Sequence, residues 1–114
     1  MTADLNALPA RQRILLTAHD LFYQEGIRAT GIDRIIKESG VTKVTFYRHF
    51  PSKNDLITAF LTYRHQQWLT WFSTSLAHHV AQTGGLLPAL APCLAEWFDE
   101  PRFRGCAFIN TAVE

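Results

Sequence analysis

The chain has 114 residues, of which 47% are hydrophobic, so it is long enough for one domain and apolar enough to build a core. This composition excludes a disordered tail, and no uninterrupted apolar run approaches the roughly 20 residues that a membrane span requires. Residues 1–53 carry eight Lys or Arg against five Asp or Glu, whereas residues 54–114 carry three against five. A basic front and an acidic rear indicate that only the front of the chain meets a polyanion.

Cysteine content and the start of the chain bear on the cellular compartment. The two cysteines, Cys93 and Cys106, stand in apolar surroundings and form no disulfide framework, which favours a reducing environment. The first residues lack the basic-then-apolar pattern of a secretion signal. We therefore expect a soluble, cytoplasmic protein with no membrane partner.

Apolar residues recur at helical spacing with almost no strand alternation, which predicts an all-α fold. Residues 1–8 are expected to form a loose arm before a helix that runs from Pro9 or Ala10 to Glu25. Gly26 then supplies the left-handed residue that ends this helix. A second, short helix is predicted over residues 31–39, with Thr30 as its N-cap and Gly40 at its end.

A third helix is predicted over residues 43–49, with Thr42 as its N-cap and Pro51 preventing its continuation. Phe46 and Phe50 face inward in this helix. The outer face then carries the polar and methyl-bearing side chains of Lys43, Val44, Thr45, Tyr47, Arg48 and His49. Two short helices joined through a glycine turn make a helix-turn-helix, and an α-helix fits the major groove of DNA, where base edges are distinguishable.

The rear of the chain is also predicted to be helical. A long helix is capped by Ser52, with Asp55 at its third position, and lasts until Thr83-Gly84-Gly85. A fifth helix covers residues 86–98, in which Pro92 implies a kink or a later start. A sixth begins near Gly105 or Cys106 and continues toward Glu114.

The segment from Val41 to Lys53, VTKVTFYRHFPSK, resembles the recognition segment of the TetR family of helix-turn-helix transcriptional regulators. Upstream of this segment, four residues stand at the spacing that the family shows: Phe22, Gly26, Thr30 and Ile35. The resemblance covers roughly residues 10–57. Downstream, Arg104-Gly105-Cys106 with Asn110 is similar to a looser motif of one branch.

The resemblance implies roles for individual residues. Residues at positions where family members often touch phosphates are Thr30, Lys43, Tyr47, His49 and Lys53. Residues at positions that often meet base edges are Val44, Thr45 and Arg48, and Thr42 completes the expected DNA-binding set. Val44 departs from the family, which frequently has glycine there, so base preference does not transfer from relatives.

The resemblance also implies a domain organisation. Residues 1–51 would form a three-helix DNA-binding head, and residues 52–114 a long connecting helix and the start of an incomplete ligand-sensing domain. The complete protein would be a homodimeric repressor that binds double-stranded DNA and is released by a small apolar or aromatic effector. Trp68, Trp71 and Trp97 are candidate effector-binding residues, although each could instead fill the core.

Other functions have less support in the sequence. A helical protein-interaction module without DNA binding remains the main alternative. No nucleophile elbow, phosphate loop or zinc-protease motif is present, so we expect neither an enzyme nor a cofactor. His65 and His79 would stand about 21 Å apart along one helix, too far to share a metal ion.

Overall fold

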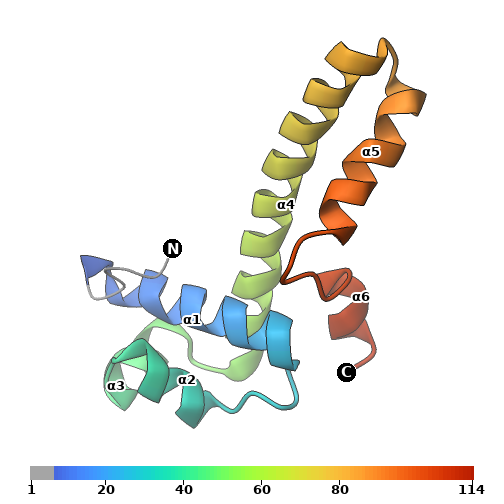
Figure 1. Cartoon of the computed structure of the whole chain (residues 1–114). Helices are drawn as coiled ribbons and strands as arrows, with labels where there is room; N and C mark the ends of the chain where they lie inside the picture. Colours follow the sequence, from blue (N-terminus) through green and yellow to red (C-terminus); the bar gives the residue numbers. More distant parts are fainter. Residues whose placement is uncertain (1–6) are drawn as a thin grey trace.

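The computed structural model describes residues 7–114, so residues 1–6 of the predicted arm lie outside the described part. This part is all-α, as predicted, and has six helices with the following bounds: α1 Ala10–Glu25, α2 Ile32–Ser39, α3 Lys43–His49, α4 Lys53–Thr83, α5 Leu86–Phe98 and α6 Ala107–Ala112. The molecule measures 53 × 33 × 21 Å along its principal axes. Figure 1 shows α1, α2 and α3 gathered at one end of α4, with α5 returning alongside α4 and α6 lying back near α1.

One hydrophobic core joins the first three helices to the beginning of α4. Its fully enclosed side chains are contributed by every one of these helices and include Ile14, Ile35, Phe46 and Leu56. Phe46 and Phe50, which were predicted to face inward, lie in this core, and Ile36 is partly buried at its edge. Because α3 is only seven residues long, this packing rather than intrinsic helix propensity holds it in place.

The start of α2 differs from the prediction. Gly31, not Thr30, is the N-cap, and no side chain caps this end of the helix. Thr30 is fully buried, and its hydroxyl donates to the carbonyl oxygen of Gly26 at 2.8 Å. The predicted cap was wrong because this hydroxyl turns back toward the end of α1 and is not available to the first amides of α2.

The long helix α4 connects the two ends of the molecule. Its predicted cap, Ser52, forms a capping box with Asp55: Asp55 N donates to Ser52 Oγ at 3.1 Å, and Ser52 N donates to Asp55 Oδ2 at 3.1 Å. After 31 residues the helix ends at Gly84, whose φ of +79° lies in the left-handed region that glycine adopts without strain. One stiff element therefore runs from the helix-turn-helix to the far end of the molecule.

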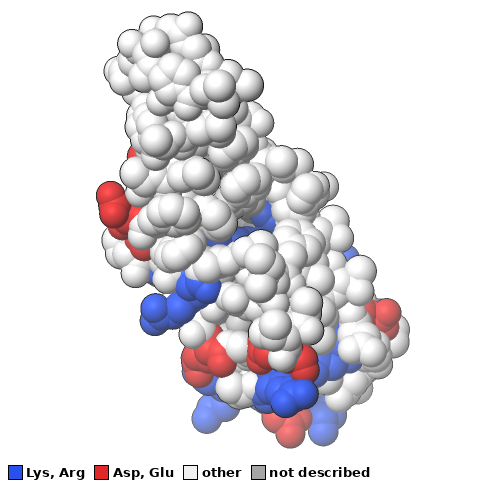
Figure 2. Space-filling view, turned by 90° about the vertical axis from the view of Figure 1, so that its right-hand side faces the viewer, with Lys and Arg blue, Asp and Glu red and all other residues white. Residues whose placement is uncertain are grey.

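The hairpin of α4 and α5 carries little charge. The sequence contains no Lys, Arg, Asp or Glu from His65 to Ala95. Figure 2 accordingly shows no such residue on the far end of the hairpin in the face in view. None of the described helices is nevertheless long and apolar enough to cross a membrane.

Pro92 does not delay the start of α5, which runs from Leu86 to Phe98 with the proline inside it. The predicted bounds of this helix are confirmed, and of the two expected effects of Pro92, a kink or a later start, the later start does not occur. Ala89 and Cys93 stand four residues apart, so they lie on the same side of α5, and both are buried. Burial of this stripe in the α4–α5 contact offsets the backbone hydrogen bond that the proline cannot donate.

The segment between α5 and α6 is fastened to α1. Tyr23 Oη donates to the carbonyl oxygen of Gly105 and accepts from Arg104 N, both at 2.8 Å. At the end of this region the Glu114 carboxylate accepts from Ile27 N at 3.0 Å and Arg28 N at 2.9 Å. These contacts place the rear of the chain against the turn that precedes α2.

Candidate nucleic-acid interface

The N-terminus of α3 is fixed by the predicted cap. Thr45 N donates to Thr42 Oγ1 at 3.2 Å, and the Thr42 hydroxyl donates to Thr45 Oγ1 at 3.0 Å. At the other end, Phe50 N donates to Phe46 O at 2.9 Å before Pro51 ends the helix. The start of this short helix is thus fixed by the Thr42 side chain, and its end is fixed by a backbone hydrogen bond and the following proline.

The two faces of α3 differ sharply. Phe46 is completely buried beneath the helix, whereas Val44 is 72% exposed and Tyr47 is 41% exposed. Lys43 and Arg48 are exposed, and Thr45 and His49 are half-buried. The structure therefore presents on one surface the side chains that the sequence placed on the outer face.

The cations of this surface are uncompensated. Within residues 7–114, neither Lys43 nor Arg48 makes an ion pair. By contrast, Arg34 on α2 pairs with Glu25 at 2.5 Å and with Glu38 at 2.6 Å. The two cations of α3 are therefore exposed and accessible to a polyanion.

Lys53 stands at the first residue of α4 and is half-buried. Its Nζ donates to the carbonyl oxygen of Ile27 at 2.7 Å and lies 6.0 Å from the centroid of the Phe22 ring. An ammonium has three N–H groups, so this bond leaves two donors for another partner.

Two residues change the predicted set. Thr30 is not brought to the surface, because it is fully buried and its hydroxyl is used by backbone carbonyls. Arg11, which the sequence reasoning missed, is exposed on α1, and its guanidinium carbon lies 5.0 Å from the Phe50 ring centroid at the end of α3. Its only signal in the sequence is a cation in the first turn of the first helix.

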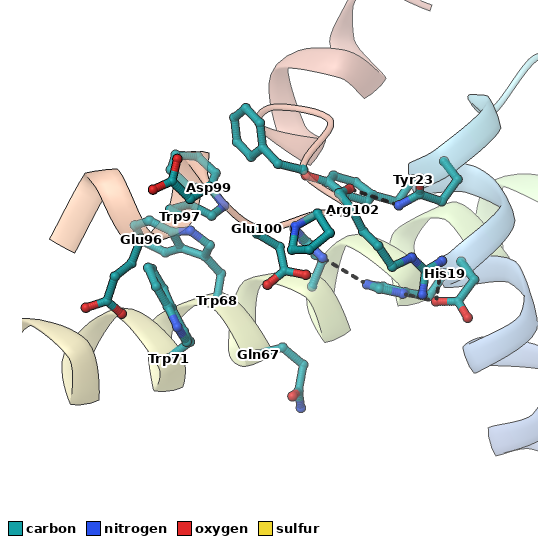
Figure 3. A pocket seen from close by; sticks show the side chains of 15 residues that line it. His19, Tyr23, Gln67, Trp68, Trp71, Glu96, Trp97, Asp99, Glu100 and Arg102 are labelled. Atoms are coloured by element: carbon teal, nitrogen blue, oxygen red, sulfur yellow. Dashed lines mark hydrogen bonds and ion pairs between the residues drawn. The ribbon is translucent and has the colours of Figure 1, made fainter. Parts of the chain in front are cut away.

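A pocket of about 640 Å³ lies behind this interface, between α1, α4, α5 and the segment that leads to α6. Its wall includes all three predicted effector-binding residues, Trp68, Trp71 and Trp97 (Figure 3). The Trp68 ring stacks on Phe72 at 4.7 Å between centroids and meets the edge of Trp97 at 5.5 Å. The sequence did not predict that α1 would form part of this wall, through residues such as His19 and Tyr23.

The α1 side of the pocket is polar and internally paired. Arg64 lies over the Tyr23 ring, with its guanidinium carbon 4.0 Å from the centroid, and Arg102 approaches Asp20 at 4.0 Å. Burial lowers the pKa of His19 below its ordinary value of 6.5, although the hydrogen bond that its ring donates to Asp20 acts in the opposite direction. The neutral imidazole is therefore favoured on this side at neutral pH.

Comparisons with known proteins agree with this geometry. Residues 14–60 match the family described as "Bacterial regulatory proteins, tetR family". An HTH-type transcriptional regulator of Staphylococcus aureus (strain bovine RF122 / ET3-1) is 47% identical over 51 residues, which are 45% of this chain and 28% of that protein. A second, from S. aureus strain USA300, is 50% identical over 46 residues, which are 40% of this chain and 25% of that protein.

The likeness to a solved structure extends further along the chain. The crystal structure of a TetR-family transcriptional regulator from Streptomyces coelicolor has a TM-score of 0.75 and 37% identity, covering 91% of this chain and 55% of that one. The chain thus spans about a quarter of the length of the curated relatives it matches and about half of the structural one. Residues 14–60 are therefore similar to the amino-terminal domain of the TetR family of bacterial regulatory proteins, and the helices that follow share the fold of such a regulator.

Proposed function

We propose that this chain is the DNA-binding head and the first sensing helices of a sequence-specific transcriptional repressor that a small apolar or aromatic molecule releases from DNA. The observation that carries the proposal is the outer face of α3, where Lys43 and Arg48 are exposed above the buried Phe46 and make no ion pair with any of residues 7–114. A rigid helix with accessible cations and hydroxyls suits the major groove.

The residues of the interface divide by chemistry. Val44, Thr45 and Arg48 are proposed to meet base edges, because they offer a methyl surface, a hydroxyl and a bidentate donor. The remaining polar residues would hold phosphates and set the register: Thr42, Lys43, Tyr47, His49 and Lys53. Thr30 is left out of this set because it is buried, and Arg11 is added because of its position beside α3.

The sensing step is supported by the position of the pocket. Trp68, Trp71 and Trp97 share its wall with residues of α1, so an occupant would touch both the head and α4. The complete protein would act as a homodimer whose two heads enter major grooves about 34 Å apart, so a small tilt of α4 would spoil the fit. Residues 1–51 and 52–114 are proposed as the corresponding functional parts.

Selection of bound duplexes from a random pool, with the longest available gene product, tests DNA binding and yields the operator. On that operator, Arg48→Ala should cost about 1–3 kcal/mol and relax preference at one or two base pairs. Lys43→Ala should weaken all duplexes similarly and reduce the salt slope by about one ion.

Arg104→Ala is the matched control, because Arg104 is exposed outside α3 and makes no ion pair within the described residues. It should leave both affinity and sequence preference unchanged. If no duplex is enriched and residual affinity is insensitive to salt, the protein is a helical interaction module and the DNA-binding proposal is wrong.

A further inference from the structure

The pocket between α1, α4 and α5 divides into two halves of different chemistry. The half that faces α1 holds Arg64, Arg102, Asp20 and His19, which contact one another or Tyr23. The half that faces α5 holds the tryptophan faces together with carboxylates that follow the end of the helix. Figure 3 shows the Glu100 carboxylate between the tryptophan group and the His19–Arg102 side.

The negative charge at the end of α5 has little internal compensation. The last turn of α5 contains no basic residue, and Asp99 and Glu100 follow it directly. Acidic residues at a helix C-terminus add to the negative end of the helix dipole and are unfavourable there. Within residues 7–114 neither carboxylate makes an ion pair, whereas Glu96 is held by His79 and Ser75.

Aromatic faces beside an uncompensated carboxylate select the charge of a ligand. The faces of tryptophan rings attract cations, and Trp is the best of the side chains in this respect. The two cations that line the pocket lie on its other half, where Arg64 lies over Tyr23 and Arg102 approaches Asp20. The volume of about 640 Å³ admits a body of several aromatic rings.

We infer that the pocket binds an organic monocation with an aromatic body, its charge near Glu100 and its rings against Trp68, Trp71 and Trp97. This inference rests on the proposed regulation by a small molecule and specifies the class of that molecule. His19 and Tyr23 of α1 line the other half of the same pocket, so the bound cation would lie next to the DNA-binding head.

Tetraphenylphosphonium and tetraphenylborate test the charge preference, because they have nearly the same shape and opposite charge. Binding to the longest available gene product would be followed by tryptophan fluorescence and calorimetry. The phosphonium should bind at least about tenfold more tightly than the borate. Equal affinities, tighter binding of the borate, or no binding of the phosphonium would overturn the inference.

Substitutions locate the bound cation. Glu100→Gln, which removes the charge and keeps the shape, should weaken the phosphonium about tenfold and leave the borate unweakened. Asp33→Asn is the matched control, since Asp33 is an exposed carboxylate on α2 outside the pocket, and should change neither affinity. Loss of phosphonium affinity in the control alone, or in neither variant, would contradict the assignment.

Operator titrations distinguish failure of this inference from failure of the proposed regulation. If the phosphonium binds at Glu100 but operator affinity is unchanged, the cation site stands and the release mechanism is wrong. If operator affinity falls equally with the borate or with a neutral aromatic compound, small-molecule release stands and the preference for a cation is wrong. Coupling requires that operator DNA weaken the phosphonium by the same factor.

Discussion

Burial separates side chains that stabilise the head from those that are free to contact a partner. On α3, side chains only two residues apart differ in exposure, since Phe46 is fully buried and Val44 is largely exposed. A side chain that fills the core contributes through the apolar area that it removes from water, whereas an exposed one contributes little to folding. The two groups should therefore respond differently to truncation.

Phe46→Ala should lower the free energy of unfolding by about 3–5 kcal/mol, because it leaves a cavity among Ile35, Phe50 and their neighbours. Val44→Ala on the same helix should change it by less than about 0.5 kcal/mol. Urea unfolding of both variants checks this. Similar losses in the two would show that α3 is not packed as described.

His19 should make stability depend on pH. Its pKa is lowered in the folded protein, chiefly by burial, so the unfolded chain binds more protons between that lowered value and 6.5. The contribution of His19 to the free energy of unfolding should thus be fully present above pH 6.5 and should be lost as the pH falls through this window. Urea unfolding at several pH values gives the slope of the free energy of unfolding against pH, and this slope should be smaller for His19→Gln than for the unchanged protein.

His78→Gln is the control for this experiment, because His78 is exposed on α4. It should retain the slope of the unchanged protein. The interpretation concerns the slope alone, since His19→Gln also removes ring contacts with Phe60 and Tyr63. An unaltered slope in His19→Gln would mean that another group is responsible.

Among the elements, α4 is the one that reaches both proposed sites, because it begins beside the helix-turn-helix and forms part of the wall of the pocket. Its start is fixed by the reciprocal bonds between Ser52 and Asp55. Loss of this cap would leave amides of the first turn without partners at the point where α4 meets α3.

Ser52→Ala should lower the free energy of unfolding by about 1 kcal/mol, within the usual range of about 0.5–2 kcal/mol for a lost N-cap. Ser73→Ala, an exposed position in the middle of the same helix, should be neutral or slightly stabilising, because alanine has the higher helix propensity. Thermal and urea unfolding distinguish the two. Equal effects would argue against a role for the capping box.

At the scale of the whole molecule, the rear segment is joined to the head by polar bonds as well as by packing. Tyr23 of α1 both donates to and accepts from the segment before α6. Arg64 covers the same ring from α4. Three elements thus meet at one side chain, where the first helices contact the rear of the chain.

Tyr23→Phe should lower the free energy of unfolding by about 1–3 kcal/mol, because it leaves Gly105 O and Arg104 N without their partner. Tyr63→Phe is the matched control: Tyr63 is half-buried on α4, and its hydroxyl makes no hydrogen bond in the described part of the chain. Hydrogen exchange should show faster opening around Arg104 in Tyr23→Phe only.

The local signals of the sequence predicted most of the helices. Gly26, Gly40 and Gly84 ended helices where expected, and Thr42 and Ser52 capped them. These signals are reliable because each acts through bonds within one turn of its own position. The inward face of α3 was equally predictable, because its apolar residues recur at helical spacing.

Contacts between distant residues were decided only by the tertiary structure. Threonine is a favoured N-cap residue, yet the hydroxyl of Thr30 donates to Gly26 O at the end of α1, so a contact outside α2 outweighed the local preference. Pro92 is tolerated because the stripe on α5 is buried against α4. The sequence marked the tryptophans, but the pocket they line requires α1 and the segment before α6, whose approach depends on bonds between residues about 80 positions apart. No local pattern specifies such a pairing, since it arises from the way the helices pack.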